Sequence, residues 1–196
     1  MTTDDLVVRL GDFDKSLPEE EEQTYRVVDI EVHSAFDTRD FDADVALLKT
    51  DRPIAFGEYV RPICMPSKAL AKSMLTVGRR GVVAGWGKLS SDAGDYPRFL
   101  KTIILPIKDL ATCRRSTKYE VTPNMFCAGY SRAGMGDSCE GDSGSPFTVQ
   151  RSDNRWYILG IVSWGEGCDR MDQYGFYVRL HRYIAWIRKK TGIKFS

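Results

Sequence analysis

The sequence predicts an all-β fold with a short helix near its C-terminal end. Short apolar or alternating runs, bounded by glycine, proline or acidic residues, recur along the chain and are typical of strands joined by turns. Residues 182–190 instead have helical periodicity, with basic residues in the last turn and Gly192 as a stop. A length of 196 residues, 42% of them hydrophobic, allows one domain or two small units that share an interface.

The first half of the chain contains three predicted strands. Residues 6–10 form an apolar run that ends at Gly11, residues 25–32 alternate in polarity, and Asp44 opens an apolar run to residue 49. Four consecutive glutamates separate the first two runs, and such a charge run is usually a solvated loop.

The second half continues the pattern. Strands are predicted at residues 81–87 and 156–164, and another begins at 105–107. Residues 109–114 resemble a short helix with Asp109 as its N-cap. The polar loop between residues 90 and 97 contains glycine and proline and is expected to be exposed.

Composition narrows the class of protein. The net charge of +1 does not point to nucleic acid or an anionic membrane surface, and no apolar run approaches the length of a membrane span. Five cysteines suggest a secreted protein from an oxidising compartment, although residues 1–5 do not resemble a signal peptide. We therefore expect the chain to be a piece of a longer secreted precursor.

Residues 136–146 have the layout of a nucleophile on a tight turn. Ser143 lies between Asp142 and Gly144, and glycine lets the backbone approach a ligand closely. The N–H groups of Gly141 and Ser143 would then form an oxyanion site. On its own, Gly-Asp-Ser-Gly also fits an ordinary polar turn.

Four further motifs remove most of that ambiguity, and they stand at residues 44–48, 84–87, 124–129 and 160–165. With the Ser143 stretch, they resemble the trypsin-like (chymotrypsin-fold, peptidase family S1) serine proteases in sequence and order. The motifs at residues 124–130, 154–157, 165–170 and 174–177 are most similar to thrombin and the related clotting proteases.

The resemblance implies two antiparallel β-barrels with the active site between them. A catalytic domain would cover residues 1–191: an incomplete first barrel at 1–62, a second barrel at 63–180 and a C-terminal helix at 181–191. We expect a secreted zymogen that hydrolyses peptide bonds after Arg or Lys, acts on protein substrates, meets protease inhibitors and requires no cofactor.

The family's catalytic roles fall on two residues here. Ser143 matches the nucleophile, and Asp44, rather than Asp42, matches the acid that orients the catalytic histidine. Asp142 matches the acid that pairs with the new N-terminal ammonium when a zymogen is activated. Most members have a second glycine where this chain has Ser145, which would be strained if that position needs a positive φ.

The resemblance also implies a substrate site. Asp137 matches the acid at the base of the primary specificity pocket, where a carboxylate pairs with Arg or Lys. Ser163 and Gly165 would bind the substrate backbone as an added strand, and Gly165 and Gly175 would line the pocket.

The catalytic histidine has no counterpart in this sequence. In the family it precedes the position of Asp44, but His33 matches a surface histidine position instead. His181 lies where the family carries other residue types, and we expect it at the surface. We therefore expect an N-terminally truncated catalytic domain that is inactive as it stands. The alternative is a protease-fold binding module without catalysis.

Disulfide connectivity rests on the resemblance, since the sequence alone allows other pairings. The family implies Cys113–Cys127 and Cys139–Cys168, and a bond from Cys64 to an upstream light chain or propeptide. Alternatively, Cys64 is a free, buried thiol.

Two structural ions are implied by family position. Calcium would take ligands from the acidic loop, and sodium would take backbone carbonyls, with an aromatic residue supporting the loop. The alternative to the calcium site is a solvated loop, and the alternative to the sodium site is an aromatic residue that only packs. The residues are Asp12, Asp14, Glu20 and Glu22 for calcium, and Arg170 and Gln173, with Tyr174 in support, for sodium.

Overall fold

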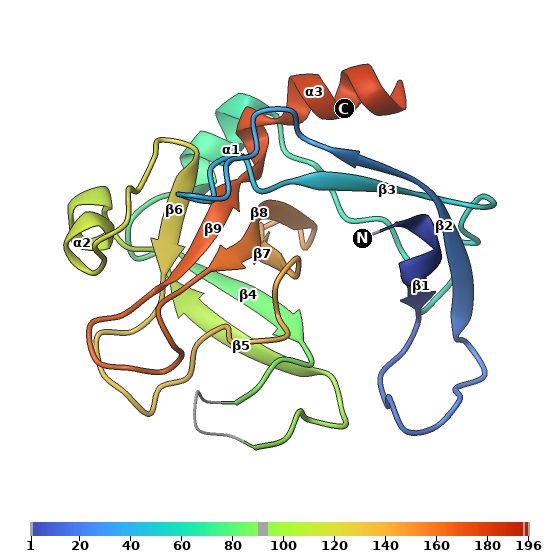
Figure 1. The fold of residues 1–196 in the computed structure, drawn as a ribbon, viewed down its shortest axis with the longest axis horizontal. Coiled ribbons are helices and arrows are strands. Elements are labelled where there is room, and N and C mark those ends of the chain that lie inside the picture. Colours follow the sequence, from blue (N-terminus) through green and yellow to red (C-terminus); the bar gives the residue numbers. More distant parts are fainter. Residues whose placement is uncertain (1, 90–93, 194, 196) are drawn as a thin grey trace.

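Two curled antiparallel sheets make up the computed structural model, which describes residues 2–89, 94–193 and 195 (Figure 1). The smaller sheet has the order β1-β2-β3 and the larger one the order β5-β4-β7-β8-β9-β6. The all-β prediction is therefore confirmed. The strands are β1 Val7–Leu10, β2 Gln23–Val32, β3 Ala46–Thr50, β4 Arg80–Gly85, β5 Lys101–Pro106, β6 Met125–Ala128, β7 Pro146–Gln150, β8 Trp156–Trp164 and β9 Gly175–Arg179.

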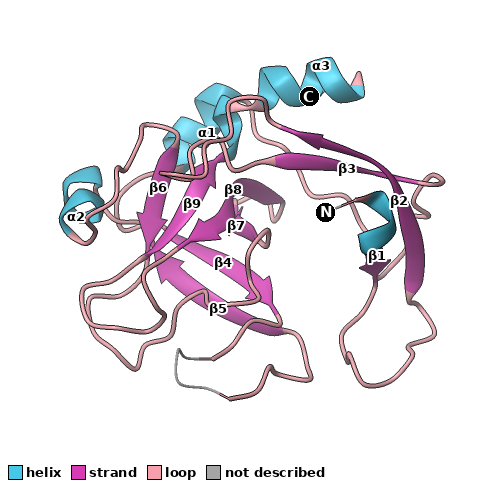
Figure 2. Cartoon of the chain, viewed as in Figure 1, coloured by secondary structure: helices cyan, strands magenta, loops and turns pink. Residues whose placement is uncertain are grey.

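Helices are short and lie outside the sheets (Figure 2). The predicted N-cap of the second helix is confirmed, because Asp109 accepts a 2.8 Å hydrogen bond from the N–H of Thr112. Gly192 ends the last helix in the left-handed conformation, as expected. The elements are α1 Lys68–Met74, α2 Leu110–Arg115, α3 Ile184–Thr191 and the 3₁₀ turns Thr3–Asp5 and Leu180–Arg182.

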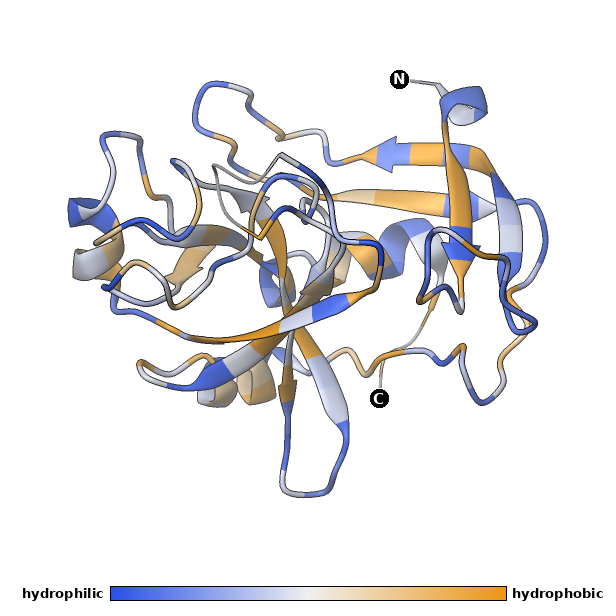
Figure 3. Ribbon diagram, turned by 90° about the horizontal axis from the view of Figure 1, so that it is seen from below, coloured by the Kyte–Doolittle hydropathy of each residue, from blue (hydrophilic) through white to orange (hydrophobic). Residues whose placement is uncertain are grey.

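The larger sheet closes on itself. The segment after β5 meets β6 through an antiparallel bridge between Ile107 and Ala128, and the N–H of Lys108 donates to the carbonyl of Cys127 at 3.0 Å. Inside, the rings of Phe126, Phe147 and Tyr177 pack within 5.0–5.2 Å of one another. Hydrophobic residues accordingly concentrate in the strands (Figure 3). This closed sheet holds the main core.

A second core cluster joins the two sheets. Ala43 and Val45, which precede β3, are buried in this cluster. Its other members include Val178 of β9, Leu180 directly after β9 and Ile187 of α3. An ion pair between Lys190 of α3 and Glu31 of β2 (2.7 Å) ties the same helix to the smaller sheet. These contacts fix the entrance of β3, and therefore Asp44, beside the larger sheet.

Most predicted strands are observed with ends that shift by at most two residues, but the strand expected to begin at Leu105 instead spans Lys101–Pro106, and helix α1 and three strands were missed. Helix α1 follows a cap at Ser67, whose Oγ accepts from the N–H of Leu70 at 3.2 Å. Strand β6 lies within the motif at residues 124–129, β9 begins within the motif at 174–177, and β7 directly follows the Ser143 stretch, so these segments were interpreted by their chemistry rather than their periodicity. The expected loop at 90–97 lies partly outside the described residues, since 90–93 are not described.

Among the residues that the structure describes, no helix combines the length and apolar character that crossing a membrane requires.

We predict that the larger sheet is locally more stable than the smaller one. The smaller sheet pairs its outer strands on one side only and exposes Val7 (63%), Val28 (51%) and Val32 (54%). In native-state hydrogen exchange, backbone amides of β4, β7 and β8 should exchange at least about tenfold more slowly than those of β1–β3. Equal protection of both sheets would contradict this prediction.

Candidate active site

The loop that carries Ser143 is fixed by a covalent bond and by a buried carboxylate. The Cys139–Cys168 disulfide joins it to the loop after β8, with a Cα–Cα distance of 5.3 Å. Asp142 is only 8% exposed, and its Oδ1 and Oδ2 accept hydrogen bonds from the N–H groups of Gly87 (2.8 Å) and Cys139 (3.0 Å). The segment that precedes Ser143 is therefore held to the loop after β8 and to the end of β4.

Gly87 is required for this arrangement. A Cβ atom at Gly87 would lie 2.3–2.5 Å from the Asp142 carboxylate, which is closer than any real contact. Because Gly87 follows β4, the carboxylate docks the Ser143 loop on the edge of the larger sheet. The side chain of Asp142 also lines a small hollow of about 180 Å³ together with Asp137.

The backbone around Ser143 leaves two N–H groups free. Among the described residues, the N–H groups of Gly141 and Ser143 have no hydrogen-bond partner, whereas those of Asp142, Gly144 and Ser145 each donate to a backbone carbonyl. Gly141 has φ +95°, and a Cβ there would lie 3.1 Å from the Cα of Gly87. Free N–H groups beside an exposed hydroxyl can stabilise a developing oxyanion.

Ser145 does not have the strained backbone that we considered. It is not among the described residues with positive φ, and its N–H and carbonyl bond to Asp142 and Val162, both at 2.9 Å. Serine is therefore accommodated at this position without backbone strain.

The structure separates the roles of the two neighbouring aspartates. Asp44 accepts a 2.6 Å hydrogen bond from the Oγ of Ser163, which lies in β8. Asp42 instead accepts from the Oγ1 of Thr122 (2.5 Å) and the Nδ2 of Asn124 (2.8 and 3.0 Å). Asp44 is thus the aspartate that lies next to the segment carrying the predicted substrate-binding residues.

The turn before Asp44 is held in an unfavourable conformation. Phe41 (φ 58°) and Ala43 (φ 53°) both adopt the left-handed region, which costs a non-glycine residue roughly 1–3 kcal/mol. Burial of Ala43 and Val45 on either side of Asp44 offsets this cost. The packing therefore fixes the carboxylate at this point.

A hollow of about 400 Å³ opens beside Ser143. It is the larger of the two hollows described around the Ser143 loop, and we call it the larger hollow. Ser143, Ser163 and Gly165 all line it, together with Ser138 and Trp164. β7 begins at Pro146, opposite Ile161, so residues 163–165 extend beyond the strand pairing on this side. An extended peptide could pair with this free backbone.

Asp137 lies behind the wall of this hollow. The carboxylate Oδ1 accepts a 2.7 Å hydrogen bond from the N–H of Ser138, whose Oγ in turn bonds to the hydroxyl of Tyr177 at 2.9 Å. A Cβ at Gly175 would lie 2.7 Å from that Oγ and 3.3 Å from the Asp137 carboxylate. Asp137 and Gly175 thus border Ser138, but the larger hollow is lined by Ser138 and not by them.

Burial changes the acidity of Asp137. Loss of solvent raises the pKa of the carboxyl group to about 7, and the nearby charges of Asp169 and Asp142 act in the same direction. The hydrogen bond from the Ser138 N–H opposes this shift. A cation that reached the carboxylate would favour the ionised form.

Sequence reasoning assigned no role to Trp164. Its ring stacks on Phe176 with a centroid distance of 3.9 Å, and Tyr119 contacts it edge-on at 5.8 Å. These contacts fix a flat apolar wall of the larger hollow. A tryptophan between Ser163 and Gly165 was the available signal.

Neither histidine belongs to this group of residues. The ring of His33 packs edge-on against Tyr183 and Trp186, at 5.1 and 5.0 Å. His181 is only 6% exposed, so the surface position expected for it is wrong. Burial, followed by nearby arginines and lysines, lowers the pKa of its imidazole to about 4. Neither one lines the hollow at Ser143.

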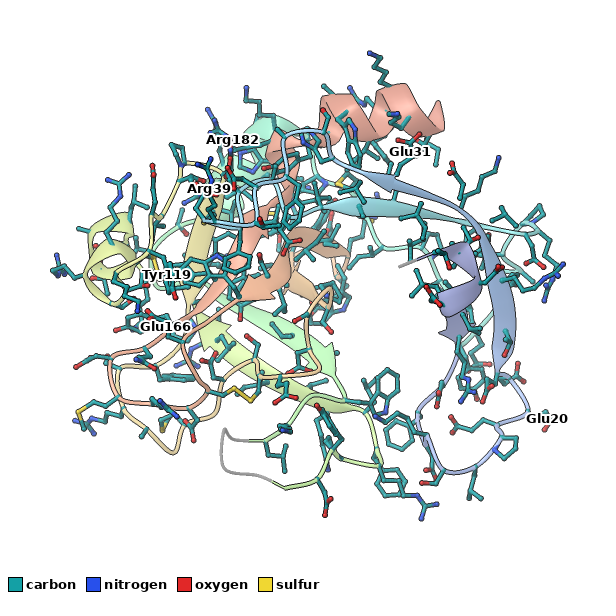
Figure 4. All side chains as sticks on the ribbon, viewed as in Figure 1. Glu20, Glu31, Arg39, Tyr119, Glu166 and Arg182 are labelled. Atoms are coloured by element: carbon teal, nitrogen blue, oxygen red, sulfur yellow. A yellow bond between two sulfur atoms is a disulfide. The ribbon has the colours of Figure 1, made fainter. Side chains whose placement is uncertain are left out.

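The four acids considered for calcium are engaged elsewhere or point to solvent. Asp14 forms an ion pair with Arg98 at 2.6 Å. Arg9 pairs with Glu22 at 3.1 Å and with Asp12 at 3.5 Å. Glu20 projects from the loop (Figure 4). Among the described residues, no three His, Cys, Asp or Glu side chains are grouped to hold a metal ion. The structure therefore gives the calcium expectation no support.

The loop considered for sodium contains one unsatisfied acceptor. The carbonyl of Arg170 accepts from the N–H of Gln173 at 3.3 Å, while the side-chain Oε1 of Gln173 is buried with no partner among the described residues. Tyr174 is 5% exposed and packs in the core cluster that includes Phe176.

The disulfides Cys113–Cys127 and Cys139–Cys168 are both present in the structure, with the pairing that the resemblance implies. Cys64 is a half-buried free cysteine. Its backbone forms a parallel bridge to Tyr157 in β8, so the segment lies alongside the start of that strand.

Comparison with known protein families matches residues 2–187 to the family described as Trypsin. The matched region contains every residue of the arrangement described above, including Asp44, Asp137, Ser143 and Ser163. Together with the curled antiparallel sheets and the short C-terminal helix, this match shows that the chain belongs to the trypsin family of serine proteases.

Proposed function

We propose that the chain forms most of a secreted trypsin-like endopeptidase domain that cleaves peptide bonds after Arg or Lys. The observation that carries this proposal is the half-buried Asp137 carboxylate, which accepts a hydrogen bond from the N–H of Ser138, a residue that lines the hollow beside Ser143. A carboxylate that retains its proton up to about pH 7 gains most from an incoming guanidinium or ammonium group.

Ser143 is the proposed nucleophile. Its hydroxyl is exposed at the rim of the larger hollow, and the free N–H groups of Gly141 and Ser143 would bind the oxyanion that forms when the hydroxyl attacks a peptide carbonyl. Asp44, held by Ser163, would orient a histidine as general base. We propose that the complete enzyme supplies this histidine from outside the present sequence.

The substrate backbone would pair with the free edge of residues 163–165, and its cationic side chain would enter the hollow toward Asp137. Gly175 keeps the space beside Ser138 free of a Cβ atom. This pairing would place the scissile carbonyl next to Ser143, since Ser163, Gly165 and Ser143 line the same hollow.

Asp142 is the proposed partner of an activating ammonium group. The small hollow that it lines with Asp137 has a volume of about 180 Å³ and brings two carboxylates together. A new N-terminus that entered there would neutralise Asp142 and brace the Ser143 loop. The enzyme would therefore be a zymogen until cleavage of the precursor creates that N-terminus. We also propose that Cys64 bonds to an upstream light chain or propeptide and that protease inhibitors occupy the larger hollow.

A non-catalytic binding module is the second candidate. It is favoured by the observation that, in the described part of the chain, neither His33 nor His181 lines the hollow at Ser143. Retention of Asp44, Asp137 and Ser143 favours the enzyme. A full-length transcript that encodes a histidine before Asp44 would support the enzyme, and one that starts at Met1 would support the binding module.

Benzamidine, a small planar cation, should bind the chain through Asp137. We predict that its affinity increases about tenfold between about pH 6 and pH 8, because ionisation of Asp137 near pH 7 creates the negative charge that the ligand pairs with. Asp137→Ser should weaken binding by about a hundredfold at pH 8 and abolish the pH dependence. Isothermal titration calorimetry measures both effects.

Glu140→Gln is the matched control. Glu140 also lines the larger hollow, but its carboxylate is exposed and pairs with Lys88 at 2.8 Å. Its loss should change benzamidine affinity by less than about twofold. Equal losses in the two variants would show that the cation responds to the general charge of the hollow, and the assignment of Asp137 would then be wrong.

A sodium ion at the carbonyls of Arg170 and Gln173, supported by Tyr174, is proposed to brace one wall of this site. Arg170 lines the larger hollow, and the unsatisfied Oε1 of Gln173 lies in the same loop. We predict severalfold tighter benzamidine binding in sodium chloride than in choline chloride at equal ionic strength. Identical affinities in the two salts would exclude a functional sodium site.

A further inference from the structure

Tyr96 packs directly on Gly141, the glycine that carries one of the two free N–H groups beside Ser143. A Cβ atom at Gly141 would lie 2.8 Å from the Cε1 of Tyr96 and 3.1 Å from the Cα of Gly87. The Cα of Gly141 is therefore enclosed between the tyrosine ring and the residue that anchors the Asp142 carboxylate. Tyr96 itself comes from the loop between β4 and β5, and 46% of its surface is exposed. None of the roles proposed above uses it.

The hydroxyl of Tyr96 holds the residue that precedes Gly141. It donates a 2.7 Å hydrogen bond to the Oε1 of Glu140, and the Nζ of Lys88 donates to the Oε2 of the same carboxylate at 2.8 Å. The bond to the carboxylate raises the pKa of Tyr96, so the hydroxyl stays protonated and acts as the donor. Tyr96 thus contacts both residues that flank the peptide bond between Glu140 and Gly141.

The direction of this peptide group is set from outside. The N–H of Lys88 donates to the carbonyl oxygen of Glu140 at 2.9 Å. Because the carbonyl and the N–H of a trans peptide point in opposite directions, this bond turns the N–H of Gly141 away from Lys88. Gly141 has φ +95°, but glycine adopts positive and negative φ about equally readily, so the residue itself does not maintain this direction. The contacts with Lys88 and Tyr96 must maintain it.

An exposed tyrosine can hold its neighbour only if its own loop is fixed. Two residues after Tyr96, the guanidinium of Arg98 donates two 2.6 Å hydrogen bonds to the carboxylate of Asp14, which is only 7% exposed. Such a two-point pair fixes the geometry of both groups. The N–H of Leu100 also donates to the carbonyl of Phe13 at 2.9 Å. Because Phe13 and Asp14 belong to the loop between β1 and β2, the smaller sheet supports the position of Tyr96.

We propose that Tyr96 is a positioning residue for the N–H of Gly141. This inference rests on the proposed function, in which that N–H and the N–H of Ser143 bind the oxyanion. The ring of Tyr96 holds the Cα of Gly141 and its hydroxyl holds Glu140, so the N–H between them stays directed toward the substrate carbonyl. A donor that is held in place in this way does not have to reorganise when the negative charge develops.

The direct test is ¹⁵N relaxation of the backbone amides of the chain. In the wild type, the order parameter of the Gly141 N–H should be that of a rigid backbone, about 0.85, and in Tyr96→Ala it should fall below about 0.6. Tyr96→Phe should stay close to the wild type, because the ring still packs on Gly141 and Lys88 still holds Glu140. Tyr59→Ala is the matched control, since it removes another exposed tyrosine from a different loop and should leave Gly141 unchanged.

N-acetyl-L-arginine provides a second readout, because it adds a carboxylate that the free N–H groups can bind, whereas benzamidine has only the cation. In isothermal titration calorimetry, Tyr96→Ala should weaken binding of N-acetyl-L-arginine at least about fivefold and change the benzamidine affinity by less than about twofold. Tyr96→Phe and Tyr59→Ala should bind both ligands like the wild type. A tyrosine that served only to stabilise the fold would not separate the two ligands.

Two results would overturn the inference. One is an order parameter of Gly141 in Tyr96→Ala that equals the wild-type value, and the other is the absence of a preferential loss of N-acetyl-L-arginine affinity in that variant. Failure of the wild type to bind benzamidine would instead contradict the proposed function. The order parameters would then still decide whether Tyr96 positions the N–H of Gly141, because they require no ligand.

Discussion

The buried carboxylate of Asp142 is the interaction on which the candidate site depends. It accepts N–H groups from Gly87, at the end of a core strand, and from Cys139, within the Ser143 loop. A buried carboxylate must be satisfied by such donors, since an unpaired one would be very costly. Because the same residue directly precedes Ser143, anchoring the carboxylate also positions the backbone at Ser143 and leaves the N–H groups of Gly141 and Ser143 free.

Asp44 is fixed by a different device. It stands between Ala43 and Val45, whose burial against β9 and α3 joins the smaller sheet to the larger one and sustains a strained turn. Ser143 and Asp44 therefore come from separately anchored segments, and β8 connects them: Ser163 bonds to Asp44, and Val162 bonds to Gly144 and Ser145. The site is built where the two sheets meet, so its geometry depends on both.

Local chemistry made part of this structure predictable. Asp109 as a cap, Gly192 as a helix stop and the glycines around Ser143 act on their immediate neighbours, so the sequence was sufficient. Long-range pairing was not predictable, because nothing local indicates that Asp14 pairs with Arg98. The same holds for Asp137, whose burial behind Ser138 depends on Tyr177 and Gly175, far along the chain.

The most direct test of this account is the benzamidine affinity of Asp142→Asn. The amide offers one acceptor and turns a donor toward one of the two N–H groups, so the Ser143 loop should lose its anchor. Although Asp142 does not line the larger hollow, we predict at least about tenfold weaker binding in a variant that keeps its near-ultraviolet circular dichroism. Wild-type affinity in this variant would contradict the claim that the buried carboxylate organises the site.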